Sequence, residues 1–413
     1  MLGKTKGNAV LAAIGSSVAS LGIFIGVIAA CVLVAGKAIA APAFGPKLIQ
    51  EEARIAAPGG YEVAATILRP AGPGPYGAII LNHGVAGSER ERLTESPAND
   101  FAVAAPILAR RGFVVVMPMR RGFGDTGGEF AEDAGSCRKP DYFRGENAAA
   151  DDVMAAYNYA RRLPYVDGSR MILAGQSAGG VVSMFAAATR HPEGLVAVLG
   201  FAAGRGGNPD LRPGVPCAVE AMARMFDAMG RDIQVPVLMH YAENDKYFNP
   251  ATSKLWYDRL TAAGAKQVQY VVQPAFGRDG HYLFGELLGV RYWLPTVEKF
   301  LAANHVRFDP IQAPGELLQA SAPTQVTSDS CKGLYRVFLE SPSPRAYAVS
   351  DDGRCGFAGG LAEARETALR ECRNVAGGSC ALYAVDSEVV WKPEAELRQA
   401  AAKPGVTAST GSR

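Results

Sequence analysis

Short apolar segments alternate with longer segments of helical periodicity along the chain from Ala78 onward. The short segments carry β-branched or other apolar residues without polar alternation, which is typical of strands buried on both faces. They cover residues 78–82, 113–117, 171–174, 196–200, 235–240 and 268–272. The helical segments between them cover residues 103–111, 148–162, 179–190, 253–263 and 287–303. This alternation predicts an α/β domain whose mostly parallel sheet is flanked by helices.

A turn and a change in composition give this domain its limits. The turn Pro58-Gly59-Gly60 separates two strand-like segments and predicts a hairpin ahead of the sheet, so we place the domain at residues 47–305. Residues 306–330 are predicted to be a linker, because they are rich in Pro, Ala, Gln, Ser and Thr and have little periodicity. The longest loops of the domain are expected to carry specificity. They cover residues 86–100, 126–146 and 202–234.

A second, smaller α+β domain is predicted at residues 331–395, followed by a disordered tail at 396–413. Its segments LYRVFLE and RAYAVS predict strands, a hairpin turn follows at Asp351-Asp352-Gly353, residues 361–373 predict a helix, and residues 382–391 a further strand. A domain of this size needs cross-links to be stable. Its helix-to-strand turn favours a disulfide between Cys372 and Cys380, which leaves Cys331 to pair with Cys355.

The amino terminus has the pattern of an export segment. Lys4 and Lys6 precede an uncharged, largely apolar run over residues 8–36, and Ala38-Ile39-Ala40 offers a small-residue cleavage site. The run is longer than the ~7–15 residues of a signal-peptide core and could cross a bilayer. Residues 1–41 are therefore a retained membrane anchor or a cleaved signal, with lipid attachment at Cys31 as a third reading. All three readings place the body of the protein outside the cytoplasm, in the periplasm or anchored to the inner membrane.

The number of cysteines and the net charge limit which cross-links, metal sites and ligands we expect. The chain has 7 cysteines, and once Cys31 is set aside an even number remains, which predicts disulfides in an exported protein. Cys137 and Cys217 lie in two of the long loops and are expected to pair with each other over a pocket. Without short C-x-x-C or H-x-x-H pairs we expect no metal. The net charge of +2 provides no electrostatic footprint for nucleic acid.

The segment AGQSAGGVV contains the candidate nucleophile, Ser177, at the spacing G-x-S-x-G. This serine follows the apolar strand MILAG and precedes the apolar helix GVVSMFAAA. Such a strand-to-helix turn exposes the serine hydroxyl, and its glycines relieve crowding. The spacing therefore predicts a nucleophilic serine rather than a flexible Gly-Ser loop.

A nucleophilic serine needs a base, and the base needs an acid that orients it. His281 is the best of the five histidines, because it lies on a loop after the predicted strand QYVVQ, at the carboxyl edge of the sheet. Asp245 follows another strand at the same edge and is the candidate acid, with Glu243 and Asp279 as competitors. No organic cofactor is needed for this chemistry.

These motifs resemble those of the α/β-hydrolase superfamily, in its dienelactone hydrolase and prolyl-oligopeptidase-like branch. The resemblance covers about residues 50–305 and rests on YVDGSRMILAGQSAGG, ILNHGVAGS, MPMRRGFGDTGG, AENDKYF and GHYLF, in this order. It implies that the chain order Ser177, Asp245, His281 is that of a catalytic triad. It also implies an oxyanion hole made by the backbone N–H groups of Val85 and Ala178. Dienelactone hydrolase itself uses a cysteine nucleophile, so the serine here favours ester hydrolysis.

In related hydrolases the loop RRGFGDTGG lies beside the pocket. Arg120 or Arg121 could therefore bind a substrate carboxylate, while the alternative is a salt bridge that holds the loop.

Together these features predict an exported serine hydrolase, a carboxylesterase that acts on a small-molecule ester or acyl substrate. Two alternatives stay open: a serine peptidase of dipeptidyl or aminopeptidase type, and a non-catalytic hydrolase fold that binds an envelope component. For the small carboxyl-terminal domain the sequence names no partner.

Overall fold

The computed structural model describes residues 48–96, 100–311, 323 and 326–391. The predicted export segment at 1–41, most of the predicted linker and the predicted tail at 396–413 lie outside these residues. Within them, none of the helices combines the length and the apolar character that a membrane crossing requires.

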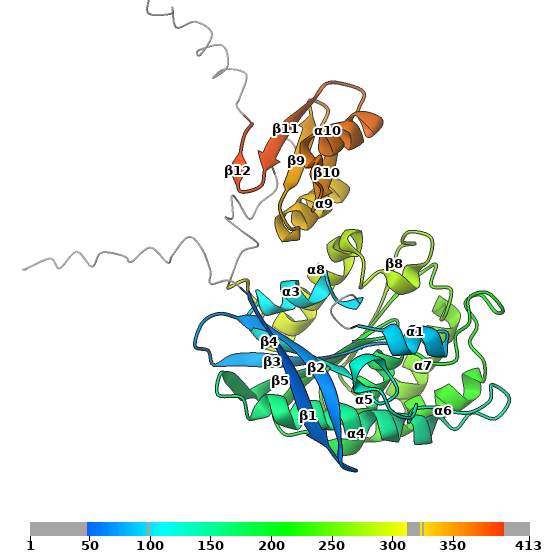
Figure 1. Cartoon of the computed structure of the whole chain (residues 1–413). Helices are drawn as coiled ribbons and strands as arrows, with labels where there is room; N and C mark the ends of the chain where they lie inside the picture. The colour runs from blue at the N-terminus through cyan, green and yellow to red at the C-terminus, as the bar shows by residue number, and fades with distance from the viewer. Residues whose placement is uncertain (1–47, 97–99, 312–322, 324–325, 392–413) are drawn as a thin grey trace, which may run out of the picture. The chain divides into compact units, whose positions relative to one another are not determined.

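An eight-stranded sheet forms the centre of the larger domain, in the order β1-β2-β4-β3-β5-β6-β7-β8 (Figure 1). The first two strands form the predicted hairpin, β2 pairs antiparallel with β4, and every later pairing is parallel. The strands are β1 (Leu48–Ala57), β2 (Tyr61–Pro70), β3 (Tyr76–Asn82), β4 (Phe113–Met119), β5 (Val166–Gln176), β6 (Leu195–Phe201), β7 (Val237–Ala242) and β8 (Val268–Gln273). The mostly parallel sheet predicted from the apolar runs is therefore confirmed.

Helices cover both faces of this sheet, which explains why its parallel strands are apolar on both sides. Along β3, Ile80 packs into one core and Ile79 into the other. The helices against the first core are α4 (Tyr142–Arg161), α5 (Ala178–Arg190), α6 (Val219–Asp232) and α7 (Pro250–Ala262). Those against the second are α3 (Ala104–Ala109) and α8 (Val290–Ala303).

Helix α6 was not predicted, because its segment was taken as part of a loop over residues 202–234. Its buried residues follow a spacing of three and four positions, which is the spacing of one helix face. They include Met222, Met225, Phe226 and Met229. The segment therefore holds a packed helix, and the loop that remains before it is shorter than expected.

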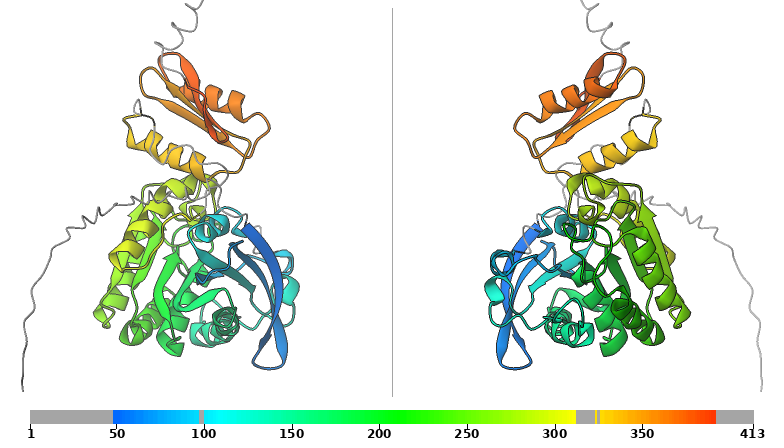
Figure 2. Two further views of the ribbon diagram at one scale, coloured as in Figure 1. Left: turned by 90° about the vertical axis from the view of Figure 1, so that its left-hand side faces the viewer. Right: turned by 90° about the vertical axis from the view of Figure 1, so that its right-hand side faces the viewer.

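The carboxyl-terminal domain has a four-stranded antiparallel sheet in the order β10-β9-β11-β12. Its strands are β9 (Arg345–Ser350), β10 (Cys355–Gly359), β11 (Cys380–Val385) and β12 (Glu388–Val389). Helices α9 (Asp329–Glu340) and α10 (Ala364–Val375) pack on opposite faces of it (Figure 2). Disulfides join Cys331 to Cys355 and Cys372 to Cys380, so both predicted pairings of this domain are confirmed.

One prediction for this domain was wrong, since LYRVFLE belongs to α9 and not to a strand. The Ser328 side chain caps the helix by accepting a hydrogen bond from the N–H of Cys331. Cys331, Tyr335 and Phe338 are buried on one side, at spacings of four and three residues. The helical period therefore prevails over the β-branched and aromatic character that suggested a strand.

Candidate active site

Ser177 lies at a sharp turn between β5 and α5, with φ 55° and ψ −123°. A positive φ is uncommon for a residue other than glycine and marks a strained turn, at a typical cost of about 1–3 kcal/mol. Two glycines make the turn possible. A Cβ on Gly179 would lie 2.0 Å from the carbonyl oxygen of Asn82, and one on Gly175 would lie 2.4 Å from the backbone of Gly179. The elbow can form only with glycine at these positions.

Asp245 and His281 are brought into contact from two different loops. His281, in a short 3-10 helix (Gly280–Tyr282), has its Nδ1 3.2 Å from both carboxylate oxygens of Asp245. Oδ1 of Asp245 also accepts hydrogen bonds from the N–H groups of Tyr247 (2.8 Å) and Phe248 (2.9 Å). The carboxylate is only 2 % exposed, so it is held in one orientation. The competing Asp279 instead caps the 3-10 helix through the N–H of His281.

The imidazole of His281 is fixed from other directions as well. The Tyr247 ring stacks on it with a centroid distance of 4.0 Å. The amide of Gln176, next to the candidate nucleophile, donates a 2.6 Å hydrogen bond to the carbonyl oxygen of His281. The position of the histidine loop is thereby tied to the elbow strand.

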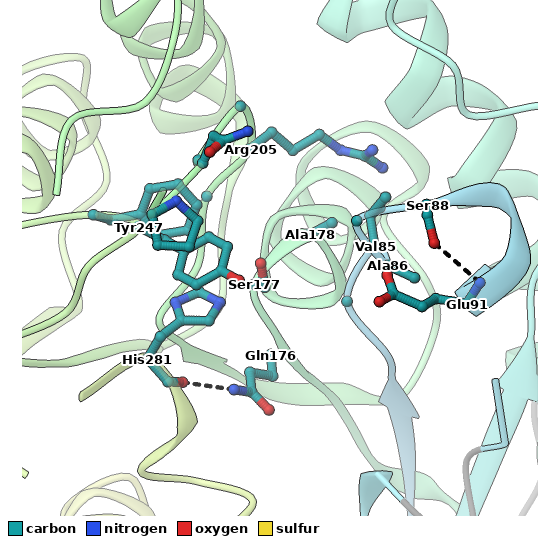
Figure 3. Close-up of a pocket in the computed structure, with 18 of the residues that line it drawn as sticks. Val85, Ala86, Ser88, Glu91, Gln176, Ser177, Ala178, Arg205, Tyr247 and His281 are labelled. Atoms are coloured by element: carbon teal, nitrogen blue, oxygen red, sulfur yellow. Dashed lines mark hydrogen bonds between the residues drawn. The ribbon is translucent and has the colours of Figure 1, made fainter. Parts of the chain in front are cut away.

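Ser177 and His281 line the same cleft, which has a volume of about 1210 Å³. Figure 3 draws Ser177 between His281 and Val85 in this cleft. Among the described residues no hydrogen bond joins the Ser177 hydroxyl to the imidazole. Such bonds often tighten only when substrate is bound.

The two predicted oxyanion donors also belong to this cleft. Val85 follows β3 through His83 and Gly84, and Ala178 begins α5. Within the part of the chain that the structure describes, neither N–H group donates a hydrogen bond to a backbone acceptor. A Cβ on Gly84 would lie 3.4 Å from the Cβ of Ser177, so the loop and the elbow are neighbours. The two N–H groups are thus free to bind an anionic oxygen near Ser177.

Neither Arg120 nor Arg121 lines the cleft, so the expectation that one of them binds a substrate carboxylate is corrected. Arg120 is fully buried and its Nε lies 2.7 Å from Oε1 of Glu132. Arg121 pairs with Asp152 at 3.0 Å. Both arginines therefore make the loop-holding salt bridges that were the alternative reading.

Arg205 is the arginine that does line the cleft, and the sequence analysis missed it. It is 8 % exposed and forms ion pairs with Glu132 and Glu146. Although burial opposes the shift, Arg120 and Arg205 lower the pKa of Glu132 to about 2. Burial raises the pKa of Glu146 to about 7, against the effect of Arg205. The available signal was that Arg205 follows β6 at the carboxyl edge of the sheet, where ligands bind in such folds.

His83 has a structural environment and not that of a base. It is completely buried, and this burial, together with the nearby Arg120, lowers its pKa to about 3. Its Nε2 accepts a hydrogen bond from the N–H of Arg120 (3.2 Å), and its Nδ1 lies 2.9 Å from the carbonyl oxygen of Gly84. His83 is therefore neutral and helps to shape the loop that leads to Val85.

Cys137 and Cys217 both line the cleft but are free thiols, so the predicted disulfide between them is not formed. The two loops do meet. Burial and a side-chain contact with Cys137 raise the pKa of Cys217. The two cysteines therefore meet as thiols and not as a disulfide.

Carboxylates dominate the charged lining of the cleft. Besides the paired Glu132, they are Glu91, Glu95, Asp100, Asp210 and Glu286. Burial, with a contribution from Asp100, raises the pKa of Glu95 to about 8. Besides His281, the described lining has Arg205 as a basic side chain. Arg205 is already paired with Glu132 and Glu146. The cleft is therefore unfavourable for an anionic ligand.

No group of three or more His, Cys, Asp or Glu residues suited to a metal ion occurs among the residues described.

Comparisons with known proteins give a family match for part of the chain and several similar solved structures. Residues 99–202 match the model of the Prolyl oligopeptidase family. No curated protein matches the chain by sequence. Among solved structures, a Klebsiella pneumoniae protein assigned as a dienelactone hydrolase is 17 % identical, covers 62 % of this chain and 99 % of its own, and has a TM-score of 0.45.

Two further solved structures are similar to the same extent. An esterase from Pyrococcus furiosus is 14 % identical, with 62 % of this chain and 91 % of its own covered and a TM-score of 0.44. An acetyl xylan esterase from a Paenibacillus species is 15 % identical, with 62 % and 84 % covered and a TM-score of 0.45. The strand order and the strained serine elbow show that residues 48–303 have the α/β-hydrolase fold, and residues 99–202 within it are similar to the prolyl oligopeptidase family.

Proposed function

We propose that the protein is a carboxylesterase that works through Ser177, His281 and Asp245. The observation that carries this proposal is the contact of His281 Nδ1 with both Asp245 carboxylate oxygens, at the edge of a cleft that Ser177 also lines. A strained serine with a buried imidazole and carboxylate nearby is an arrangement that acyl transfer requires and that a passive binding module does not.

The reaction would follow from this geometry. Ser177 Oγ attacks the ester carbonyl while His281 Nε2 takes the hydroxyl proton, and Asp245 stabilises the imidazolium that forms. The N–H groups of Val85 and Ala178 bind the oxyanion of the tetrahedral intermediate. The intermediate then expels the alcohol, which receives the proton from His281, and leaves an acyl group on Ser177. Water repeats the same steps and releases the carboxylic acid.

The acidic lining of the cleft favours one alternative, a serine peptidase that holds the amino group of its substrate. Glu91, Asp210 and Glu286 are the kind of side chains that an ammonium group would pair with. The same lining predicts that neutral or cationic esters are better substrates than anionic ones.

The test compares p-nitrophenyl butyrate with peptide p-nitroanilides, using wild type and Ser177→Ala. Replacing Ser177 should lower ester turnover by up to ~10⁶-fold, because nucleophile and base act as one unit. Asp245→Asn should cost on the order of 10⁴, since it favours the wrong imidazole tautomer. Glu243→Gln, which changes a neighbouring carboxylate, is the control for Asp245, and Ser169→Ala on β5 is the control for Ser177.

A fluorophosphonate probe gives an independent readout, because it should label wild type at Ser177 and leave Ser177→Ala unlabelled. Equal turnover in wild type and Ser177→Ala, or labelling at another serine, would falsify the proposal. Faster cleavage of the anilides than of the ester would favour the peptidase instead.

We also propose that the protein acts outside the cytoplasm, on the basis of the apolar run over residues 8–36 and supported by the two disulfides, which persist in oxidising compartments. An alkaline phosphatase fusion after residue 45 should then be active in a bacterial host. An inactive fusion would contradict export.

A further inference from the structure

A network of buried charges lies beneath the loop that carries Val85. It consists of Arg120, Glu132, Arg205 and Glu146, of which the least buried, Arg205, is 8 % exposed. Burying charges is costly unless each is paired and hydrogen-bonded. The hydrogen-bond partners of these groups therefore show which part of the structure the network holds in place.

Arg120 donates hydrogen bonds to the backbone carbonyl oxygens of the two residues that precede Val85. Its Nη1 donates to the carbonyl oxygen of His83 (2.9 Å), and its Nη2 donates to that of Gly84 (3.0 Å). Its own backbone N–H donates to Nε2 of His83. Both carbonyl groups are thus held by one planar guanidinium, whose fork geometry is rigid.

The contact with Gly84 has a direct consequence for Val85. The carbonyl of Gly84 and the N–H of Val85 belong to the same peptide unit, which is planar and trans, so the two groups point in opposite directions. Fixing the carbonyl oxygen on the guanidinium therefore fixes the direction of the N–H. A cation at the carbonyl oxygen also polarises the peptide unit and makes its N–H a stronger donor.

Glu132 keeps Arg120 in position for this task. Its carboxylate lies 2.7 Å from Nε of Arg120 through one oxygen and 3.4 Å from Nη2 through the other. It is 1 % exposed, and its second partner, Arg205, comes from the wall of the cleft. The carboxylate neutralises a guanidinium that could not otherwise remain buried.

We propose that Arg120 and Glu132 are positioning residues that orient and polarise the Val85 N–H toward the oxyanion through the Gly84 carbonyl. This rests on the proposed function, in which Ser177 attacks an ester and Val85 binds the oxyanion. Arg120 lies outside the lining of the cleft, Glu132 lines it but is 1 % exposed, and both act on the transition state through the peptide unit.

The neighbouring pair Arg121 and Asp152 provides a matched control. Asp152 is 1 % exposed, as Glu132 is, and it accepts hydrogen bonds from the backbone N–H and the Nε of Arg121. Arg121 also donates to the carbonyl oxygen of Ala148. Among the residues described, this pair makes no hydrogen bond to residues 83–85. Asp152→Asn therefore breaks a buried ion pair next to Arg120 without releasing the oxyanion loop.

The experiment measures kcat and KM for p-nitrophenyl butyrate in Arg120→Lys, Glu132→Gln and Asp152→Asn. Loss of a complete oxyanion donor costs roughly 10²–10³ in kcat, so misdirecting one should cost about 10-fold to 100-fold. We expect this loss in Arg120→Lys and Glu132→Gln, with KM close to that of wild type. Lysine keeps the charge but cannot hold both carbonyl oxygens with one fork. Asp152→Asn should keep its kcat.

A trifluoromethyl ketone reports on the oxyanion itself. Ser177 Oγ adds to its carbonyl carbon, the serine proton moves to His281, and the former carbonyl oxygen becomes a hemiketal oxyanion. In a ¹⁹F NMR titration, the pKa of this hemiketal should be higher in Arg120→Lys and Glu132→Gln than in wild type and Asp152→Asn. A general loosening of the fold would not raise it selectively.

Near-wild-type kcat in folded Glu132→Gln and Arg120→Lys would overturn the proposal, and so would an equal loss in Asp152→Asn. If both Arg120 and Glu132 variants fail to fold while Asp152→Asn folds, the pair holds the domain and not the donor, and the proposal is again overturned. Failure of the proposed function would look different, because Ser177→Ala would then retain its ester turnover.

Discussion

His83 and His240 are both enclosed, at 0 % and 2 % exposure, and burial lowers the pKa of each to about 3. An unfolded chain binds a proton at a histidine near pH 6.5. Between these values the unfolded state binds more protons than the folded state, so the free energy of unfolding must fall as the pH is lowered from about 6.5 toward 3. Above pH 6.5 this stabilisation is fully present.

Urea unfolding at pH 7, 5 and 4 measures this dependence. His240→Gln should make the decline between pH 6.5 and 4 shallower than in wild type, because one of the two titrating groups is removed. His305→Asn is the control, since His305 is exposed and its φ of 59° suits asparagine. An unchanged slope in His240→Gln would show that His240 does not titrate on unfolding.

Single residues were predictable from the sequence where local geometry constrains them. The sharp turn at Ser177 was predicted because a serine between glycines at a strand-to-helix junction has few other uses, and the contact of His281 with Asp245 because few histidines compete for that position. Arg205 was not found, because its partners Glu132 and Glu146 lie far from it in sequence and only folding brings them together. The predicted disulfide between Cys137 and Cys217 was wrong, because the two loops lie close together without forming the bond.

The elbow between β5 and α5 depends on close packing against the end of β3. A Cβ on Gly179 would lie 2.0 Å from the carbonyl oxygen of Asn82 and 2.5 Å from that of His83. Both are backbone atoms and cannot move aside cheaply. Gly179→Ala should therefore lower the free energy of unfolding by at least the ~1–3 kcal/mol typical of overpacking, and should also lower kcat by displacing the oxyanion loop.

The control for this substitution is Gly168→Ala in β5. A Cβ there would meet the Arg161 side chain at 3.5 Å, which is ordinary contact, and its φ lies outside the left-handed range. Denaturant unfolding and ester turnover should both stay near wild type. If Gly179→Ala is as stable as Gly168→Ala, the elbow is not packed as described.

Helices and strands were predictable from the sequence where burial determines which residue types they contain. The parallel strands are apolar on both faces and were all recognised, whereas α9 and α6 were not. The segment LYRVFLE has the composition of a strand, and only its cap at Ser328 and its one-sided burial reveal a helix. The segment of α6 follows a long run of Gly and Pro, which hid the start of a regular pattern.

Among the residues that the structure describes, the disulfide bonds that a reductant can break lie in one part of the chain. Both disulfides lie in the carboxyl-terminal domain, while Cys137 and Cys217 are free thiols. Dithiothreitol, or Cys331→Ala with Cys355→Ala, should therefore destabilise this domain by about 3 kcal/mol per lost disulfide. Ester turnover should be unaffected, because none of the proposed catalytic residues lies there.

Limited proteolysis with and without reductant follows the small domain, and p-nitrophenyl butyrate follows the other. Oxidised protein handled in parallel is the control. Loss of turnover at the reductant concentration that opens the small domain would mean that the hydrolase domain needs its neighbour.

At the scale of the molecule, the α/β class and the presence of a second sheet after residue 331 could be predicted from the sequence, because periodicity and composition change along the chain. The strand order could not be read from periodicity. Strand β2 pairs antiparallel with β4 and does not lie beside β3, and this order depends on long-range packing.

The proposed triad is spread over three strand ends, since Ser177 follows β5, Asp245 follows β7 and His281 follows β8. In a refolding experiment, ester turnover would therefore count only the molecules in which the sheet has closed from β5 to β8. Fluorescence or helix content would recover earlier, because local contacts form before distant ones. The delay between the two signals would measure how long the strands that carry the proposed triad take to assemble after local structure has formed.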